Sequence, residues 1–217
     1  MNKSSYYKDG FTNVFQVNTS EELLALQTKI YDCTSNFLVS HDLDLHLSKK
    51  LQLPFKAIPS GDLWSDVMNE INQSRELNSL KESSTLIEKF SELFEKPKIY
   101  PISIFRARLP GQGRAIYDWH QDAGTWYLSK NKIVANKAPA TLWFSVNGSD
   151  KTNSIQLIKY SHKKRLYDHK FVKGQGYFSA NLKNSNVDTS KIISIETKPS
   201  EALMFHPLTL HRSAPIY

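Results

Sequence analysis

Apolar residues recur at helical spacing over roughly the first hundred positions. A capping box, Thr19 to Glu22, precedes the first run, which consists of Leu23, Leu24, Leu26, Ile30 and Tyr31. We expect this helix to end near Phe37. Two further runs begin near Ser60 and Ser84, and their apolar members are Leu63, Trp64, Val67 and Ile71, and Leu86, Ile87, Phe90, Leu93 and Phe94. The pattern predicts a helical segment that ends before Pro97 and Pro101.

From Ile99 onward the pattern changes to short runs rich in β-branched and aromatic residues, with turn residues between them. The runs are residues 102–105, 140–146, 155–158, 192–197 and 202–205. Several short strands behind a helical leader are typical of an antiparallel sandwich or jelly roll. We therefore expect a mainly β fold with N-terminal helices packed on one sheet.

The length of 217 residues fits one medium-sized domain, and no linker interrupts the sequence. The contents of hydrophobic residues, 40%, and of charged residues, 23%, are those of an ordinary packed globular protein. We expect a single domain over residues 1–217. Residues 1–98 would form a helical leader packed on the core, and residues 99–217 would form the core itself.

Charge and cysteine content exclude several classes of function. The net charge of +7 comes from scattered lysines, and the densest basic run, residues 162–165, is too short to follow a nucleic-acid backbone. The excess favours an anionic small molecule as partner. Cys33 is the sole cysteine, so no intramolecular disulfide can form, and no segment approaches the ~20 apolar residues of a membrane span. These features favour the cytoplasm and exclude a membrane role, and they leave the oligomeric state open.

The segment from Tyr117 to Tyr127 carries the most informative chemistry. In an extended backbone, residues i and i+2 project to one side, so His120 and Asp122 can reach the same metal. His211, from a distant strand, would complete a set of two histidines and one carboxylate, which leaves open positions on Fe(II) for oxygen and a cosubstrate. Chance alone produces a His-x-Asp pair in about a third of chains of this composition. The competing interpretation is that His120 and Asp122 simply lie on the polar face of an edge strand.

Three blocks in order resemble the phytanoyl-CoA dioxygenase family of iron- and 2-oxoglutarate-dependent oxygenases. The blocks are 120–122, 152–163 and 205–213, and the resemblance covers roughly residues 99–217. It implies a double-stranded β-helix, which is a kind of jelly roll, with iron at its open mouth. His120, Asp122 and His211 match the family's iron ligands. In the middle block Asn153, Ser161 and His162 match, whereas Ser154, Lys159 and Tyr160 replace glycine and proline residues of the family pattern.

The same resemblance implies a site for 2-oxoglutarate. Ser213 matches a serine of the family's carboxylate clamp, and Trp143 is similar to a tryptophan that packs over the cosubstrate. The family's arginine lies about ten residues after the distal histidine, and this sequence ends six residues after it. We expect that arginine, on the last strand of the core, to follow Tyr217. Arg106 or Arg108, which share one face of a predicted strand, would otherwise take its place.

Substrate contacts are expected from residues that flank the metal motif and from the middle block: Arg114, Tyr117, Trp126, Tyr127 and Asn153. A core position explains such aromatic residues equally well. His162, His169 and His206 are better explained as structural histidines than as ligands. No catalytic residue is expected beyond the metal ligands.

The resulting hypothesis is an Fe(II)- and 2-oxoglutarate-dependent dioxygenase that uses O2 to hydroxylate a small organic substrate. Asp122 fills the metal position that a halogenating relative keeps for chloride, so hydroxylation is favoured. One alternative is a ligand-binding jelly roll without catalysis, for which no tight metal is expected. Another is a hydrolase that holds zinc with the same three residues and needs no oxygen.

Overall fold

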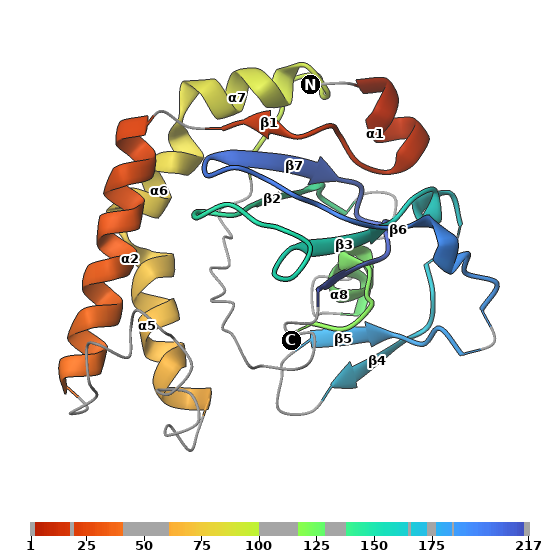
Figure 1. Ribbon diagram of the computed structural model, residues 1–217. Coiled ribbons are helices and arrows are strands. Elements are labelled where there is room, and N and C mark those ends of the chain that lie inside the picture. The colour runs from red at the N-terminus through yellow and green to blue at the C-terminus, as the bar shows by residue number, and fades with distance from the viewer. Residues whose placement is uncertain are drawn as a thin grey trace. The chain divides into compact units, whose positions relative to one another are not determined.

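The computed structural model describes residues 3–17, 20–40, 61–99, 117–128, 138–164, 166–172, 177–183 and 185–214 (Figure 1). The chain divides into two compact units. Residues 17–113 and 216–217 form a helical unit, and residues 1–16 and 114–215 form a β-rich unit. Each is described by itself.

The helical unit contains α2 (Ser20–Ser40), α5 (Gly61–Gln73), α6 (Arg75–Glu82) and α7 (Ser84–Ser91). Helix α6 begins at a polar cap, because the Ser74 hydroxyl accepts the backbone N–H of Leu77 at 3.2 Å. The three helices predicted from apolar spacing are present, and α6 is an additional one. The predicted cap residue Thr19 and the predicted strand 102–105 lie outside the described residues.

Helix α2 packs with α5 and α6 inside this unit. Its buried residues are Leu26, Cys33 and Phe37, whose spacing of seven and four residues places them on one helix face. The Lys29 ammonium lies 2.7 Å from the Glu70 carboxylate and links α2 to α5. Among the helices in the described ranges, none combines the length and apolar character that crossing a bilayer requires.

The first sheet of the β-rich unit has the order β1-β7-β2, and all its strands are antiparallel. Its strands are β1 (Phe15–Gln16), β2 (Thr141–Phe144) and β7 (Glu201–Phe205). The chain enters it through helix α1 (Lys3–Asp9), and the Thr12 amide donates to the Met204 carbonyl at 2.8 Å. The first residues of the chain therefore belong to this sheet, which the expectation of a purely helical leader did not include.

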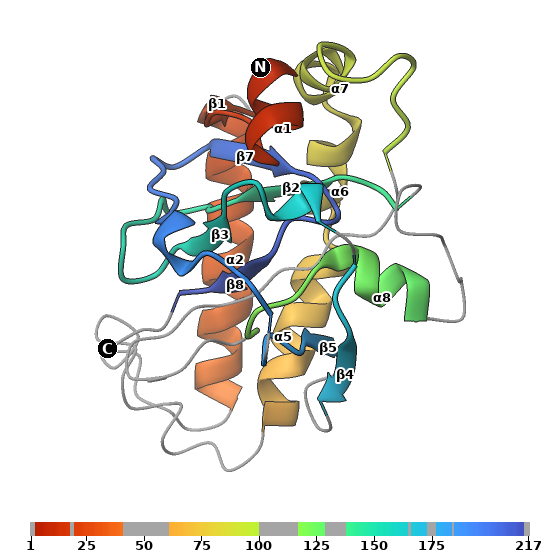
Figure 2. The ribbon, with the colours of Figure 1, turned by 90° about the vertical axis from the view of Figure 1, so that its right-hand side faces the viewer.

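The second sheet has the order β6-β3-β8, again antiparallel. It contains β3 (Ile155–Ile158), β6 (Ile192–Ser194), which follows the short helix η3 (Thr189–Lys191), and β8 (His211–Ser213). A separate antiparallel pair consists of β4 (His169–Val172) and β5 (Tyr177–Ala180). The short helix η2 (Ser161–Lys163) lies between β3 and β4, and α8 (Asp122–Leu128) lies beside β5 in both views (Figures 1 and 2).

Side chains from both three-stranded sheets meet in one hydrophobic cluster. Its buried members are Phe11, Ile155, Leu157, Ile195, Leu203 and Phe205, with Trp143 and Ile193 packed against them. Alternation along β3 and β7 places every second residue in this cluster. Helices and antiparallel sheets were predicted and are confirmed. The predicted run 155–158 is strand β3, the runs 140–146 and 192–197 contain β2 and β6, and the run 202–205 covers all of β7 except its first residue.

Candidate metal centre

The segment before Asp122 lies between β8 and β5, and its His120 forms an isolated antiparallel bridge to His211. The His120 amide donates to the His211 carbonyl and the His211 amide donates to the His120 carbonyl, both at 3.0 Å. On the other side, the Ala180 amide of β5 donates to the Trp119 carbonyl at 2.7 Å. His120 and His211 are thus direct neighbours across a strand pair, although they are far apart in sequence.

Asp122 does not continue the extended segment that ends at His120, because it is the first residue of α8. The expectation that His120 and Asp122 share one side of an extended backbone is therefore wrong in its geometry. The chain turns after Gln121. Here the Gly124 amide donates to the Gln121 carbonyl and the Ala123 amide donates to the Pro207 carbonyl, both at 2.9 Å. The turn still directs the Asp122 carboxylate toward the histidines.

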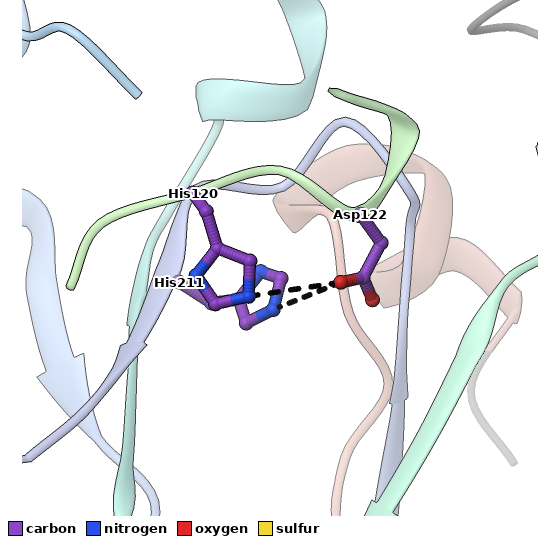
Figure 3. Close-up of side chains that lie close together, drawn as sticks. All are labelled: His120, Asp122 and His211. Atoms are coloured by element: carbon purple, nitrogen blue, oxygen red, sulfur yellow. Dashed lines mark ion pairs between the residues drawn. The ribbon is translucent and has the colours of Figure 1, made fainter. Parts of the chain in front are cut away.

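The ligating atoms of His120, Asp122 and His211 all lie within 4.8 Å of one another. His120 Nε2 is 3.7 Å and His211 Nε2 is 3.5 Å from the same oxygen, Asp122 Oδ1, and Figure 3 shows both rings directed at it. Within the described ranges this is the single group of three or more such side chains close enough to share a metal ion. The convergence expected from the sequence is present.

Backbone carbonyls fix the orientation of both imidazoles. His120 Nδ1 lies 2.8 Å from the Asp118 carbonyl oxygen, and His211 Nδ1 lies 2.9 Å from the Thr209 carbonyl oxygen. A carbonyl only accepts, so each Nδ1 carries a proton, and each Nε2 is the nitrogen that faces Asp122. Both side chains are buried. An Nδ1–H held by a carbonyl leaves Nε2 as the nitrogen that can bind a metal ion.

Burial sets the protonation of the site. Desolvation lowers the pKa of His120 to about 3, and the neighbouring His211 adds to this effect. Burial alone would raise the pKa of the Asp122 carboxyl, but His211, His120 and the Thr141 hydroxyl together lower it below its ordinary value. At neutral pH the site therefore holds a neutral His120 and an ionised carboxylate, which are the forms that bind a metal ion.

Gln121, between His120 and Asp122, joins the segments that carry the candidate site. Its side chain is fully buried, its amide nitrogen donates to the Leu208 carbonyl at 2.7 Å, and its amide oxygen accepts the Tyr167 amide at 2.8 Å. The turn that leads to His211 is thereby tied to the His-x-Asp motif. The structural role of Gln121 was not predicted, because a buried amide side chain has no signature in the hydrophobic pattern.

His169, at the start of β4, supports the same turn. Its Nδ1 donates to the Tyr167 carbonyl at 2.7 Å, and its Nε2 accepts the Gln121 amide at 3.2 Å. The ring lies directly against Gly124 of α8. Burial lowers the pKa of His169, which keeps Nε2 available as an acceptor. His169 is a structural histidine, as expected.

His162 and His206 are structural as well. His162 Nε2 donates to the Tyr7 carbonyl at 3.0 Å, and His206 Nδ1 accepts the Leu208 amide at 3.1 Å. Their rings lie 5.3 Å apart. Burial, with a contribution from His162, lowers the pKa of His206 to about 4. Neither residue joins the triad.

Aromatic side chains line one side of His120. The Tyr117 ring lies 5.7 Å from the His120 ring, and the Tyr177 ring lies 5.7 Å from it and 4.5 Å from Tyr117. The Tyr177 hydroxyl accepts the Asp118 amide at 2.9 Å, so β5 also holds the segment before the motif. Tyr117 was predicted near the site, whereas Tyr177 was missed.

The residues expected at the cosubstrate site are placed as follows. Ser213 lies two positions after His211 on β8 and shares its face, and Trp143 lies two positions after Thr141 on β2. Arg106 and Arg108 lie outside the described residues. Arg212 points to the opposite face from His211, because its guanidinium bonds to Gln156 at 2.8 Å and stacks over Trp119.

Of the expected substrate contacts, Trp126 and Tyr127 are on α8, and Trp126 is one helical turn beyond Asp122. Tyr127 is half exposed. Asn153 lies in an exposed turn, where its side-chain oxygen accepts the Asp150 amide at 2.9 Å. Arg114 lies outside the described residues.

A family model identifies the family of this chain, and solved structures resemble its fold. The family model described as phytanoyl-CoA dioxygenase matches residues 6–216. Among solved structures, the non-heme monooxygenase ThoJ in its nickel complex gives a TM-score of 0.55 at 11% identity over 99% of this chain and 70% of that chain. EvdO2 from Micromonospora carbonacea var. aurantiaca, complexed with 2-oxoglutarate, gives 0.52 at 14% identity over 98% and 82%. The search of curated proteins found no match. Family and structures together imply a cupin-like jelly roll.

Proposed function

Because the chain belongs to the phytanoyl-CoA dioxygenase family, we propose that it hydroxylates a small organic substrate at an Fe(II) ion held by His120, Asp122 and His211. The chain is an Fe(II)- and 2-oxoglutarate-dependent oxygenase, the class to which this family belongs. Beyond membership of this class, we propose the identity of the three metal ligands, hydroxylation as the reaction and a small organic molecule as the substrate.

One observation carries the assignment of ligands. Both Nε2 atoms face a single carboxylate oxygen at 3.5 and 3.7 Å, while both Nδ1 atoms are bonded to backbone carbonyls. Ligand atoms about 2.1 Å from a metal and at right angles stand ~3.0 Å apart. The two Nε2–Oδ1 distances exceed this separation by about 0.5 and 0.7 Å, and all three ligating atoms lie within 4.8 Å of one another, so a modest approach of the side chains would let the donor set hold Fe(II).

When bound, Fe(II) supplies the activation of O2, with 2-oxoglutarate as the source of electrons. The chain contributes a neutral His120, an ionised Asp122 and a fixed orientation of both rings. Burial of His120 and His211 keeps water away from the ligating atoms on their side. A set of three protein ligands leaves the remaining positions free for cosubstrate and oxygen.

Asp122 favours hydroxylation over halogenation, since its carboxylate takes the position that chloride would need. The two antiparallel sheets that share one core support a double-stranded β-helix for the β-rich unit. The net charge of +7 favours an anionic small molecule.

The remaining contacts belong to the same proposal. We assign Ser213 and Trp143 to the 2-oxoglutarate site because they lie on the faces that carry His211 and Thr141. Arg106 or Arg108 would pair with the far carboxylate of the cosubstrate. We assign substrate contacts to a group that flanks the triad or belongs to the middle block: Arg114, Tyr117, Trp126, Tyr127 and Asn153.

The test is the metal content of protein purified without oxygen, followed by succinate release on adding 2-oxoglutarate and air. We expect about one iron per chain and succinate formation in the wild type, and loss of both in His120→Ala and His211→Ala. His206→Asn, which changes a histidine outside the triad, is the matched control. Zinc in place of iron with no succinate, or iron content unchanged in both alanine variants, would contradict the proposal.

A further inference from the structure

The two oxygens of the Asp122 carboxylate have different partners. Oδ1 faces both histidine Nε2 atoms. Oδ2 accepts a hydrogen bond from the Thr141 hydroxyl. A carboxylate can bind a metal through one oxygen or through both, and here one oxygen already has a protein donor.

Thr141 comes from a part of the fold separate from α8, which carries Asp122. It is the first residue of β2, and it pairs with Phe205 of β7 in the sheet register. Phe205 is fully buried, and its ring lies 4.5 Å from the His211 ring. The hydroxyl is thus fixed by the strand pair that also packs against a second ligand.

We propose that Thr141 is a positioning residue that makes Asp122 a one-oxygen ligand. By holding Oδ2, its hydroxyl prevents the carboxylate from rotating and keeps Oδ1 toward the two imidazoles. This inference rests on the proposed metal site and adds a determinant of how many positions on the ion stay open. A carboxylate bound through both oxygens would take one of the positions that cosubstrate and O2 need.

The consequence concerns metal binding before any turnover. Without the hydroxyl, the carboxylate must be ordered by the metal itself, and Oδ2 is free to approach the ion. Loss of a hydrogen-bond partner behind a ligand typically reduces metal affinity about 10- to 100-fold. The number of coordinated oxygens also determines the visible absorption spectrum of a bound Co²⁺ ion.

The experiment is titration of the full metal-free chain with Co²⁺, which reports affinity and absorption spectrum without oxygen chemistry. Thr141→Val keeps the branched shape of the side chain and removes the hydroxyl, whereas Thr141→Ser keeps the hydroxyl. Thr152→Val is the matched control, because the Thr152 hydroxyl donates to the Asp150 carboxylate at 2.6 Å in an exposed turn. Thr141→Ser and Thr141→Ala form a second pair that differs only by the hydroxyl, for use if valine prevents folding.

We expect Thr141→Val to bind Co²⁺ about 10- to 100-fold more weakly, with an altered spectrum, and Thr141→Ser and Thr152→Val to match the wild type within about threefold. A Thr141→Val protein with wild-type affinity and spectrum would overturn the role of Thr141 and leave the metal site intact. A wild type that binds no Co²⁺, or binds it equally well after His211→Ala, would overturn the metal site itself.

Discussion

A methyl group at position 124 would collide with the ring of His169. The Cβ of an alanine there would lie 2.6 Å from His169 Nε2 and 2.7 Å from two ring carbons, about 0.8 Å inside the 3.4 Å limit of ordinary contact. The ring is held on both nitrogens, by the Tyr167 carbonyl and the Gln121 amide. Gly124→Ala must therefore displace either the ring or the helix that begins at Asp122.

The sign of the effect is diagnostic. In an unobstructed helix, replacing glycine by alanine stabilises by about 1 kcal/mol. Here overpacking costs about 1–3 kcal/mol and each lost hydrogen bond about 1 kcal/mol, so we expect a net loss of about 1–3 kcal/mol in the free energy of unfolding. His169→Ala removes the obstructing ring. In that background Gly124→Ala should be neutral or stabilise by up to about 1 kcal/mol, which gives a coupling of about 1–4 kcal/mol.

Urea unfolding of the metal-free wild type, both single variants and the double variant measures this coupling. Because α8 starts at a proposed ligand, Gly124→Ala should also weaken Co²⁺ binding, and His169→Ala should restore part of it. Additive effects of the two substitutions, or a stabilising effect of Gly124→Ala alone, would show that the ring of His169 does not obstruct position 124.

Two further predictions follow from contacts of Gln121 and His206, and a third follows from the sequence resemblance. Gln121→Ala should lower the free energy of unfolding by about 2–4 kcal/mol, because it leaves the Leu208 carbonyl and the Tyr167 amide without their partner. Gln156→Ala, which removes a hydrogen bond to Arg212, should lower it by less, and urea unfolding measures both values. Burial lowers the pKa of His206 from about 6.5 in the unfolded chain to about 4 in the folded chain, so the folded chain binds this proton more weakly. The free energy of unfolding should therefore fall as pH decreases from about 6.5 toward 4. His206→Asn keeps an acceptor for the Leu208 amide and should reduce the slope of stability against pH by up to ~1.4 kcal/mol per unit; an unchanged slope would contradict this assignment. Arg106→Ala or Arg108→Ala should raise the 2-oxoglutarate concentration needed for half-maximal succinate formation at least tenfold, and an unchanged requirement in both would exclude these arginines from the cosubstrate site.

The parts of this fold that repeat a pattern could be predicted from the sequence. The apolar run 155–158 is a buried strand, and the helical spacing after residue 20 gives α2. Residue type and order, supported by a family resemblance, also indicated His120, Asp122 and His211. These signals are local in the chain, so each can be recognised without knowledge of the tertiary structure.

Features that depend on tertiary contact could not be predicted in this way. Helix α8 has seven residues, too few for a periodic signal in the sequence. It is held by the hydrogen bond from the Ala123 amide to the Pro207 carbonyl. Strand β1 has two residues and exists through its pairing with β7. Thr141 meets Asp122 only because β2 and α8 come together, and no spacing rule connects the two positions.

We propose that the three converging side chains hold the iron ion at which O2 oxidises 2-oxoglutarate. Incubation of the chain with Fe(II), 2-oxoglutarate and isotopically labelled O2, followed by mass spectrometry of the succinate, tests it directly. We predict that succinate gains one labelled oxygen atom and that His211→Ala forms none. Unlabelled succinate, or labelled succinate in equal yield from His211→Ala, would contradict the claim.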